Sequence, residues 1–232
     1  TGYNIGAKNA FAYDIQAACS GFLFSATTGA KFIESGAYKN VIVVGADKMS
    51  TITDYTDRAT CILFGDAAGA ILLQANDQGF GLQDSWMRVD GVGAEFLHMK
   101  GGGSKNPPTH ETVDKKWHYL FQDGKPVFKA AVKGMAEAVN EILKRNNLSP
   151  DDIRFVVPHQ ANLRIIQAVA DYLKFPMERV MVNIQKYGNT TSATIPLCLW
   201  EWEDQLKPGD KVILTSFGGG YTWGASLWTW AY

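Results

Sequence analysis

Three residues whose side chains could do chemistry lie where predicted strands end. Cys19 stands in "YDIQAACSGF", where a strand-like run gives way to a helical pattern. His159 closes the apolar run "RFVVPHQAN", and Asn189 lies in "QKYGNTT". A free cysteine behaves as a small buried hydrophobe, so packing explains Cys19 when it is taken alone. A helix N-terminus favours the thiolate, which makes a nucleophile the alternative interpretation.

Each residue also has a structural explanation, but the combination suggests a reaction. His159 could be a satisfied core histidine, Asn189 a turn residue, and "FGGGYTWG" a glycine hairpin. Together they offer a thiol with a nearby imidazole, and glycines that let backbone N–H groups approach an oxyanion. A neutral His Nε2–H and an Asn amide supply two donors for a second negative charge. Such a set suits acyl transfer through a thioester followed by stabilisation of an enolate.

The first part of the chain alternates strands and a helix. Residues 10–16 alternate as a strand does, and a helix is predicted over 20–36 with Gly36 as its C-cap. The run 40–47 is continuously apolar and β-branched, which predicts a strand buried on both faces, and 61–74 ends in another buried strand. These features predict an α/β layered fold.

The second part repeats this alternation after an irregular stretch. A helix is predicted from Pro126, a short strand before His159, helices near 162–174 and 193–205, and two strands around Gly218–Gly220. We therefore divide the chain into 1–77, an irregular connection or lid over 78–124, and 125–232. Two halves that meet face to face would bring their strand ends to a shared crevice.

Composition excludes several classes of protein. The 232 residues are 46% hydrophobic and carry a formal net charge of −1, which argues against a nucleic-acid binder. Apolar runs are too short for a membrane span. Three widely spaced cysteines do not form a disulfide pattern and favour a reducing, cytoplasmic location. Cys61 and Cys198 are interpreted as packing residues, and four scattered histidines predict no metal site.

Four segments resemble the signatures of a known family. "AACSGF", "PHQANLRI", "YGNTT" and "FGGGYTWG" are similar, in order and spacing, to those of 3-oxoacyl-(acyl-carrier-protein) synthase III, a thiolase-like condensing enzyme. The resemblance runs from about residue 3 to the C-terminus. It implies an α-β-α-β-α layered fold of two similar halves, of which the N-terminal half is incomplete here.

The resemblance assigns a role to each catalytic candidate. Cys19 would take the acyl group from an acyl-CoA. His159 and Asn189 would promote decarboxylation of a malonyl-acyl carrier protein, and the carbanion would attack the acyl-cysteine to give a 3-oxoacyl carrier protein and CO2. The backbone N–H groups of Cys19 and Gly219 would form the oxyanion hole. No cofactor is implied, and the product would start fatty-acid synthesis.

It also implies substrate contacts and a carrier-docking surface. Phe217 would line the site near the thiol, Asn162 would contact the pantetheine arm, and Gly124 and Phe128 would lie along its tunnel. Arg164 would dock the acidic carrier protein, and Lys129 and Lys133 would add to that patch or simply form a solvated helix face.

The sequence departs from the family pattern in three places. Asp171 and Tyr172 stand where some relatives carry paired lysines, which weakens the basic patch. The loop 84–118 is longer than is usual in the family, so the resemblance does not predict the shape of the acyl pocket there. The family has roughly 90 residues before the cysteine segment, and we expect them to exist as a separate or additional segment, or this chain to be inactive alone. "NAFAYDI" matches a strand that pairs across a two-fold axis, so a homodimer is expected, although an internal strand is the alternative.

Three alternatives remain open. A priming enzyme of polyketide or quinolone biosynthesis would keep Cys19, His159 and Asn189 but use another acyl donor or a CoA-bound extender. A half-chain scaffold would act only with a partner that supplies the N-terminal part. A hydrolase using Cys19 and His159 would have no use for Asn189 as a second enolate donor.

Overall fold

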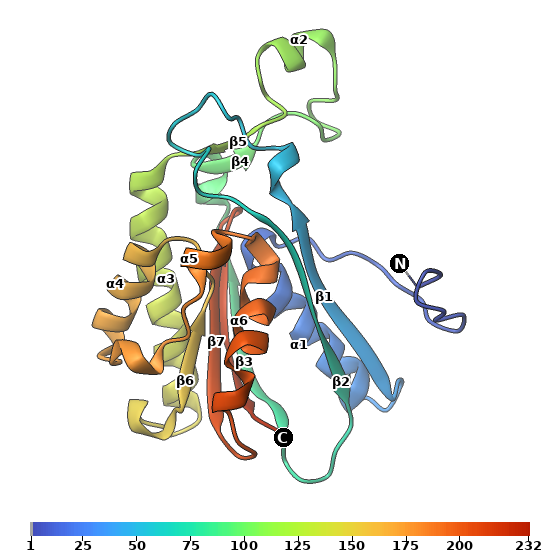
Figure 1. The fold of residues 1–232 in the computed structure, drawn as a ribbon, viewed down its shortest axis with the longest axis vertical. Helices are drawn as coiled ribbons and strands as arrows, with labels where there is room; N and C mark the ends of the chain where they lie inside the picture. Colours follow the sequence, from blue (N-terminus) through green and yellow to red (C-terminus); the bar gives the residue numbers. More distant parts are fainter. Residues whose placement is uncertain (1) are drawn as a thin grey trace.

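The computed structural model describes residues 2–232 of the chain (Figure 1). Its helices and strands follow one another as α1 Gly21–Glu34, β1 Asn40–Lys48, β2 Asp66–Gln74, β3 Gly81–Val89, β4 Leu97–Met99, α2 His110–Asp114, β5 Leu120–Gln122, α3 Gly124–Arg145, β6 Phe155–Pro158, α4 Leu163–Leu173, α5 Ile184–Tyr187, α6 Thr194–Trp202, β7 Lys211–Gly218 and β8 Thr222–Thr229. Short 3-10 turns link several of them, and one of these, η1 Ala18–Ser20, precedes α1.

Two sheets carry the architecture. The larger has the strand order β3-β8-β7-β6, in which β6 and β7 are parallel and the other pairs antiparallel. The smaller is the antiparallel pair β1-β2, with Val44 opposite Ala70. Helices α3 and α4 cover one face of the larger sheet, while α1 and α6 lie between the two sheets (Figure 1). The order of layers is therefore helix, sheet, helix, sheet.

Each side of the larger sheet has its own apolar core. One joins α3 and α4 to the sheet through residues such as Met135, Ile142 and Ile166. The other joins α1 and α6 to the opposite face through Phe22 and Ile195. Both helix pairs bury the apolar stripe that their sequence period predicts. Because the larger sheet is packed on both faces, the ends of its strands are held in fixed positions.

The predicted helices and most predicted strands are confirmed. Helix α1 ends where expected, and Gly36 has a φ of +74°, the left-handed conformation that glycine adopts without strain. At the start of α3, the Asp123 side chain accepts a hydrogen bond from the Lys125 N–H. The strands β7 and β8 flank Gly218–Gly220, as the glycine pattern predicts.

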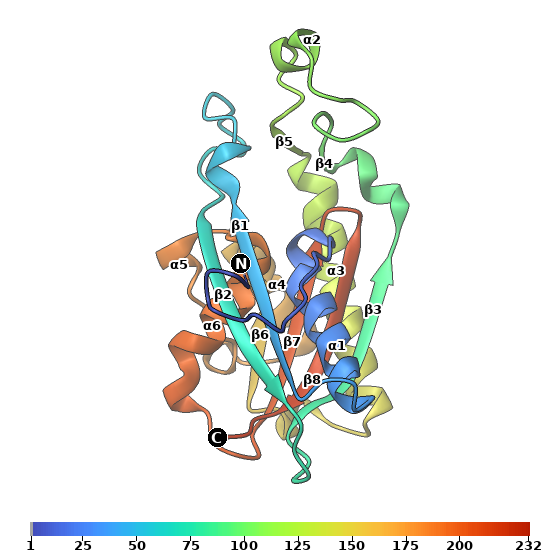
Figure 2. The ribbon, with the colours of Figure 1, turned by 90° about the vertical axis from the view of Figure 1, so that its right-hand side faces the viewer.

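Four sequence predictions are wrong in detail. Residues 10–16 form no strand, because no other segment of residues 2–232 pairs with them. Strand β1 is not buried on both faces and β2 is not a buried strand, because Ile42 and Leu72 on the outer face of this pair are 56% and 57% exposed. Figure 2 views this outer face, and no helix lies in front of the two strands. The stretch 78–124 is not irregular throughout, since residues 81–89 form β3 and pair with β8. Pairing with distant segments decides the state of 10–16 and of β3, whereas β1 and β2 are exposed because no element among residues 2–232 covers their outer face.

None of the helices in residues 2–232 is both long enough and apolar enough to cross a membrane.

Candidate active site

A pocket of about 660 Å³ lies at one end of the larger sheet, where the ends of several elements meet. Cys19, His159 and Asn189 all line it, although they are far apart in the sequence. Its lining includes residues of β4, β5 and the segment 52–64, together with residues of η1, the β7–β8 turn and the N-terminal part of α3. The crevice predicted from the strand ends is therefore present.

The backbone around Cys19 is held by contacts from both sides. Cys19 lies in the turn η1, whose first residue, Ala18, has a φ of +46° and donates its N–H to Gln16 Oε1 at 2.9 Å. The Ser216 hydroxyl donates to the Cys19 carbonyl at 2.8 Å. A Cβ atom at position 218 would lie 2.7 Å from the Cys19 nitrogen, so only glycine lets β7 come this close. The thiol is thus presented at a fixed point before α1.

His159 follows directly on β6 and is only 1% exposed. Its backbone N–H donates to the Thr215 carbonyl at 2.8 Å, which extends the pairing of β6 with β7. Ring atom Nδ1 lies 2.7 Å from Thr194 Oγ1. Ring atom Nε2 is buried and has no hydrogen-bond partner among the described residues. The free ring nitrogen is therefore the one available to a ligand.

Asn189 is oriented by its own loop. Its Oδ1 accepts the Thr191 N–H at 2.9 Å, so the NH2 group is left to donate to a ligand in the pocket. Its backbone is fixed on both sides, because its N–H donates to the Leu63 carbonyl and its carbonyl accepts the Gly65 N–H, each at 2.9 Å. His159 and Asn189 can therefore offer two side-chain hydrogen bonds from neighbouring walls.

Burial determines the charge state of both titratable groups. It lowers the pKa of His159 to about 3, against a smaller opposing effect of the Thr191 backbone, so the ring is neutral near pH 7. Burial, together with the Asp47 carboxylate, raises the pKa of the Cys19 thiol to about 12. The thiolate expected from the helix N-terminus is therefore not the resting form of the empty pocket.

The other predicted site residues fall into two groups. Five of them line the pocket: Phe217, Gly219, Gly124, Phe128 and Asn162. Asn162 is also the N-cap of α4, where its Oδ1 accepts the Arg164 N–H at 2.8 Å. By contrast, Arg164, Lys129 and Lys133 lie outside the pocket with exposed side chains on α4 and α3.

Sequence reasoning missed two residues that shape the site. Thr194 contacts the His159 ring, but it lies five residues after "YGN", within a stretch read as the start of a helix. Asp47 lines the pocket and accepts hydrogen bonds from the Ser192 N–H, at 3.1 Å, and from the Ser192 hydroxyl. The sequence did hold a signal for Asp47, because it ends the apolar run "VIVVGAD". The argument from strand ends that singled out His159 applies to it equally.

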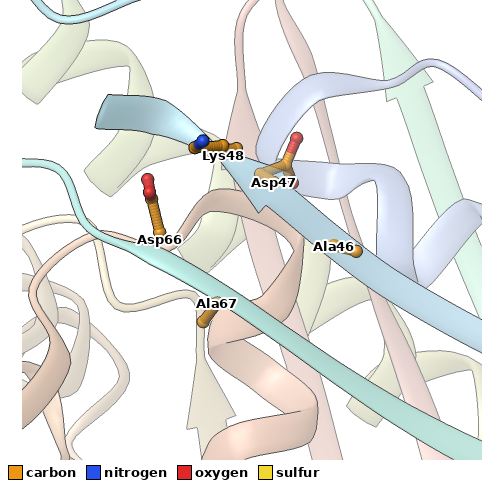
Figure 3. Close-up of a pocket in the computed structure, with 5 residues that line it drawn as sticks. All are labelled: Ala46, Asp47, Lys48, Asp66 and Ala67. Atoms are coloured by element: carbon orange, nitrogen blue, oxygen red, sulfur yellow. The ribbon is translucent and has the colours of Figure 1, made fainter. Parts of the chain in front are cut away.

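A second, shallow pocket of about 490 Å³ lies on the ends of β1 and β2 (Figure 3). Its five lining residues are Ala46, Asp47, Lys48, Asp66 and Ala67. It shares Asp47 with the deeper pocket but none of the three catalytic candidates. No group of three or more His, Cys, Asp or Glu side chains in residues 2–232 is arranged to hold a metal ion.

Family models match both halves of the chain. The model described as 3-oxoacyl-[acyl-carrier-protein (ACP)] synthase III matches residues 13–91, and the model of its C-terminal part matches residues 143–230. The β-ketoacyl-[acyl-carrier-protein] synthase III of Porphyromonas gingivalis is 55% identical over 230 residues, which cover 99% of this chain and 69% of that relative. The β-ketoacyl-[acyl-carrier-protein] synthase III 2 of Bacteroides thetaiotaomicron is 55% identical over 228 residues, which cover 98% of this chain and 68% of that relative.

Solved structures give the same result and confirm the thiolase-like layered fold. The 3-oxoacyl-[acyl-carrier-protein] synthase III of Aquifex aeolicus superposes with a TM-score of 0.89 at 40% identity, over 98% of this chain and 70% of that structure. A priming β-ketosynthase of the R1128 polyketide pathway superposes with a TM-score of 0.88 at 32% identity, over 99% of this chain and 68% of that structure. The chain therefore belongs to the 3-oxoacyl-(acyl-carrier-protein) synthase III family of condensing acyltransferases.

Proposed function

We propose that this chain starts fatty-acid synthesis by joining an acyl group from acyl-CoA to a malonyl-acyl carrier protein. The observation that carries the proposal is the meeting of Cys19, His159 and Asn189 in one pocket of about 660 Å³. A pocket of this size accommodates a pantetheine arm together with a short acyl chain. The family to which the chain belongs catalyses this class of reaction.

In the first half-reaction, Cys19 attacks the thioester carbonyl. Because the thiol is protonated in the empty pocket, its proton leaves as the new bond forms. The negative charge on the carbonyl oxygen would be stabilised by the backbone N–H groups of Cys19 and Gly219. Phe217, which is buried and packs on Tyr221, lines the apolar wall of the pocket. Coenzyme A then leaves with the proton.

In the second half-reaction, a malonyl thioester loses CO2. The electron pair of the broken C–C bond moves onto the thioester as an enolate, whose oxygen accepts hydrogen bonds from His159 and Asn189. Both donors are preorganised, since Thr191 orients the amide and Thr194 contacts the ring. The enolate carbon then attacks the acyl carbon, the bond from that carbon to the Cys19 sulfur breaks, and the released thiolate takes a proton from water to regenerate the thiol.

The pantetheine arm would enter past Gly124, Phe128 and Asn162, which line the pocket near the N-termini of α3 and α4. We assign carrier docking to the exposed side chains of Arg164, Lys129 and Lys133 on the same two helices. None of these steps draws on a bound cofactor.

We also propose that the chain works as a homodimer in the cytoplasm. The extended segment 10–16 has no partner strand among residues 2–232 and would pair with its copy across a two-fold axis. All three cysteines are free, which suits a reducing compartment.

The deciding experiment is intact-protein mass spectrometry after incubation with acetyl-CoA and longer acyl-CoAs, with Cys19→Ala as the control. One acyl adduct that is lost in the variant is expected, and the chain-length preference would identify the primer. Absence of an adduct with every donor would refute the proposal for this chain by itself.

A second candidate is a priming enzyme of polyketide biosynthesis, favoured by the 32% identity to the R1128 priming ketosynthase. It would use the same triad with a different donor or extender. Condensation assays with malonyl-acyl carrier protein and malonyl-CoA, each with the preferred primer, would separate the two functions.

A further inference from the structure

Ser192 lies where strand β1 meets the loop 188–193, which carries Asn189. Its backbone N–H donates to Asp47 Oδ2 at 3.1 Å, and its hydroxyl donates to the same carboxylate oxygen. Strand β1 comes this close because residue 45 is glycine, where a Cβ would lie 2.5 Å from the Ser192 carbonyl oxygen. Hydrogen bonds to a carboxylate are stronger than those between neutral groups. The contact between Asp47 and Ser192 therefore ties this loop to the end of β1.

Thr191, directly before Ser192, has an unusual backbone conformation. Its φ is +51°, in the left-handed region that costs free energy for a residue with a β-branched side chain. Such a conformation persists only where the surrounding contacts enforce it. On one side, the Thr191 N–H donates to Asn189 Oδ1 at 2.9 Å. On the other side, Asp47 holds Ser192. The carboxylate thus helps to keep the Thr191 N–H directed at the Asn189 side chain.

We propose that Asp47, bound to Ser192, is a positioning residue for the Asn189 amide. This inference rests on the proposed condensing function. In that reaction the Asn189 NH2 group donates to the enolate oxygen that forms as CO2 leaves, and a donor stabilises such a charge best when it is already in place. Without the contact, Thr191 would relax from its left-handed conformation, and the amide that accepts its N–H would turn away.

The contact should matter for only one of the two half-reactions. Decarboxylation needs the Asn189 amide, whereas acylation needs the thiol of Cys19. The carbonyl of Cys19 is held by the Ser216 hydroxyl on β7, which is a different support. Loss of the contact should therefore slow CO2 release and spare acylation, while a general loss of folded protein would lower both.

Two variants weaken the contact to different degrees. Ser192→Ala removes the hydroxyl bond and keeps the Asp47 carboxylate, and Asp47→Ala removes both bonds. We expect CO2 release from malonyl-acyl carrier protein to fall about 3–10-fold in the first and about 10–100-fold in the second, as for other misplaced catalytic groups. The loss should appear in kcat, with KM within about twofold, because the amide acts on the developing enolate. Acylation of Cys19 by acetyl-CoA should stay above about a third of the wild-type rate in both variants.

Ser50 and Asp66 supply a matched control outside the catalytic pocket. The Ser50 N–H and hydroxyl donate to the Asp66 carboxylate at 2.7 and 2.6 Å. This is the same pair of contacts as at Asp47, but neither Ser50 nor Asp66 lines the catalytic pocket. Ser50→Ala and Asp66→Ala should leave both half-reactions within about twofold of wild type. Thermal unfolding of all four variants measures any loss of folded protein, and if Asp47→Ala does not fold, Ser192→Ala carries the same comparison.

A double-mutant cycle tests whether Asp47 acts through Asn189. Two residues that act as a unit have non-additive effects. In an Asn189→Ala background the amide is already absent, so Asp47→Ala should lower CO2 release by less than about a further twofold. An equal fold-loss in the wild-type and Asn189→Ala backgrounds would overturn the inference, and so would unchanged CO2 release in both Asp47→Ala and Ser192→Ala.

Hydrogen exchange of the Thr191 amide, followed by NMR, measures the positioning without relying on catalysis. Because this N–H donates to Asn189 Oδ1, its exchange should be at least about 10-fold faster in Asp47→Ala and unchanged in Asp66→Ala. Equal protection in wild type and Asp47→Ala would refute the inference, since Asp47 would then not hold Thr191. If wild type neither becomes acylated nor releases CO2, the proposed function fails, while the exchange rates still decide whether Asp47 positions this loop.

Discussion

At the scale of single residues, the pocket holds its reactive groups uncharged until a substrate arrives. Burial keeps the Cys19 thiol protonated and the His159 ring neutral. In a thiolate–imidazolium pair, each ion already stabilises the other. Hydrogen bonds from the backbone donors would then add less stabilisation. With neutral groups, the proposed reaction would develop its charge on the substrate oxygen, where preorganised donors stabilise it. The reactivity of Cys19 is therefore set by what surrounds the thiol.

Asp47 is the charged group that most directly opposes ionisation of Cys19. Asp47→Asn should lower the pKa of the thiol and accelerate its alkylation by iodoacetamide about 3–10-fold at pH 8, because a like charge is removed. The measurement is the pH profile of the alkylation rate, followed by mass spectrometry. Asp66→Asn is the matched control, since Asp66 lies on the neighbouring strand and does not line the catalytic pocket. An unchanged profile in Asp47→Asn would show that this charge has no influence on the thiol.

The buried His159 ring should make the fold sensitive to acid. Its pKa is about 3 in the folded chain, against 6.5 for an ordinary histidine, so the unfolded chain binds the extra proton between these values. Stability should therefore be fully present above pH 6.5 and be lost as the pH falls toward 3. The slope from this single group is at most about 1.4 kcal/mol per pH unit.

Urea unfolding at a series of pH values between 7 and 4 measures this slope. His159→Gln has no titrating ring and should show a shallower dependence over the same range. Identical slopes in wild type and variant would mean that other groups cause the acid sensitivity.

At the scale of elements, the site depends on close approach between turns that different strands support. The turn η1 and the end of β7 come together through Gly218, and Ser216 on β7 holds the Cys19 carbonyl. The loop after α5 carries Asn189 between Leu63 and Gly65. Each reactive group thus has backbone support from a second element, which keeps it in place in the empty protein.

Gly218→Ala tests this approach directly. The new Cβ would lie 2.7 Å from the Cys19 nitrogen, so β7 and η1 would have to separate. We expect a loss of stability of about 1–3 kcal/mol, as for other overpacked sites, and a larger loss of Cys19 acylation. Gly103→Ala is the control, since a Cβ there meets nothing within 4 Å. Wild-type acylation in Gly218→Ala would show that the backbone position of Cys19 is not critical.

The elements also show which features a sequence can predict. Helices such as α3 were predicted because caps and apolar periodicity are local. Cys19, His159 and Asn189 were singled out because each follows a recognisable run, and all three line one pocket. Strand β3, the exposed face of β1 and the unpaired segment 10–16 were not predicted, because their state depends on partners distant in sequence. The role of Thr194 was missed for the same reason, since its contact with His159 joins residues 35 positions apart.

At the scale of the whole molecule, the pocket opens beside the N-terminal ends of α3 and α4. Lys129 and Arg164 are exposed on these helices, and Phe128 and Asn162 next to them line the pocket. A carrier protein that docks there would need only its pantetheine arm to reach Cys19. Tyr172, at the far end of α4, is 63% exposed and carries no charge. Basic side chains are also present at the opposite end of α3, where Lys144 and Arg145 lie in its last turn, so a test of docking needs a control at that end.

Charge reversal on this surface should separate carrier docking from chemistry. Arg164→Glu together with Lys129→Glu should raise the KM for malonyl-acyl carrier protein about 10-fold or more, because attraction to an acidic partner becomes repulsion. Acylation of Cys19 by acetyl-CoA should stay within about twofold, since neither side chain lines the pocket. Lys144→Glu, at the opposite end of α3, serves as the matched control with the same type of charge change. The difference between wild type and the double variant should shrink as salt is raised from 50 to about 500 mM, because exposed charges are screened. An equal effect of the control, or a loss of acylation in the double variant, would place carrier docking elsewhere on the molecule.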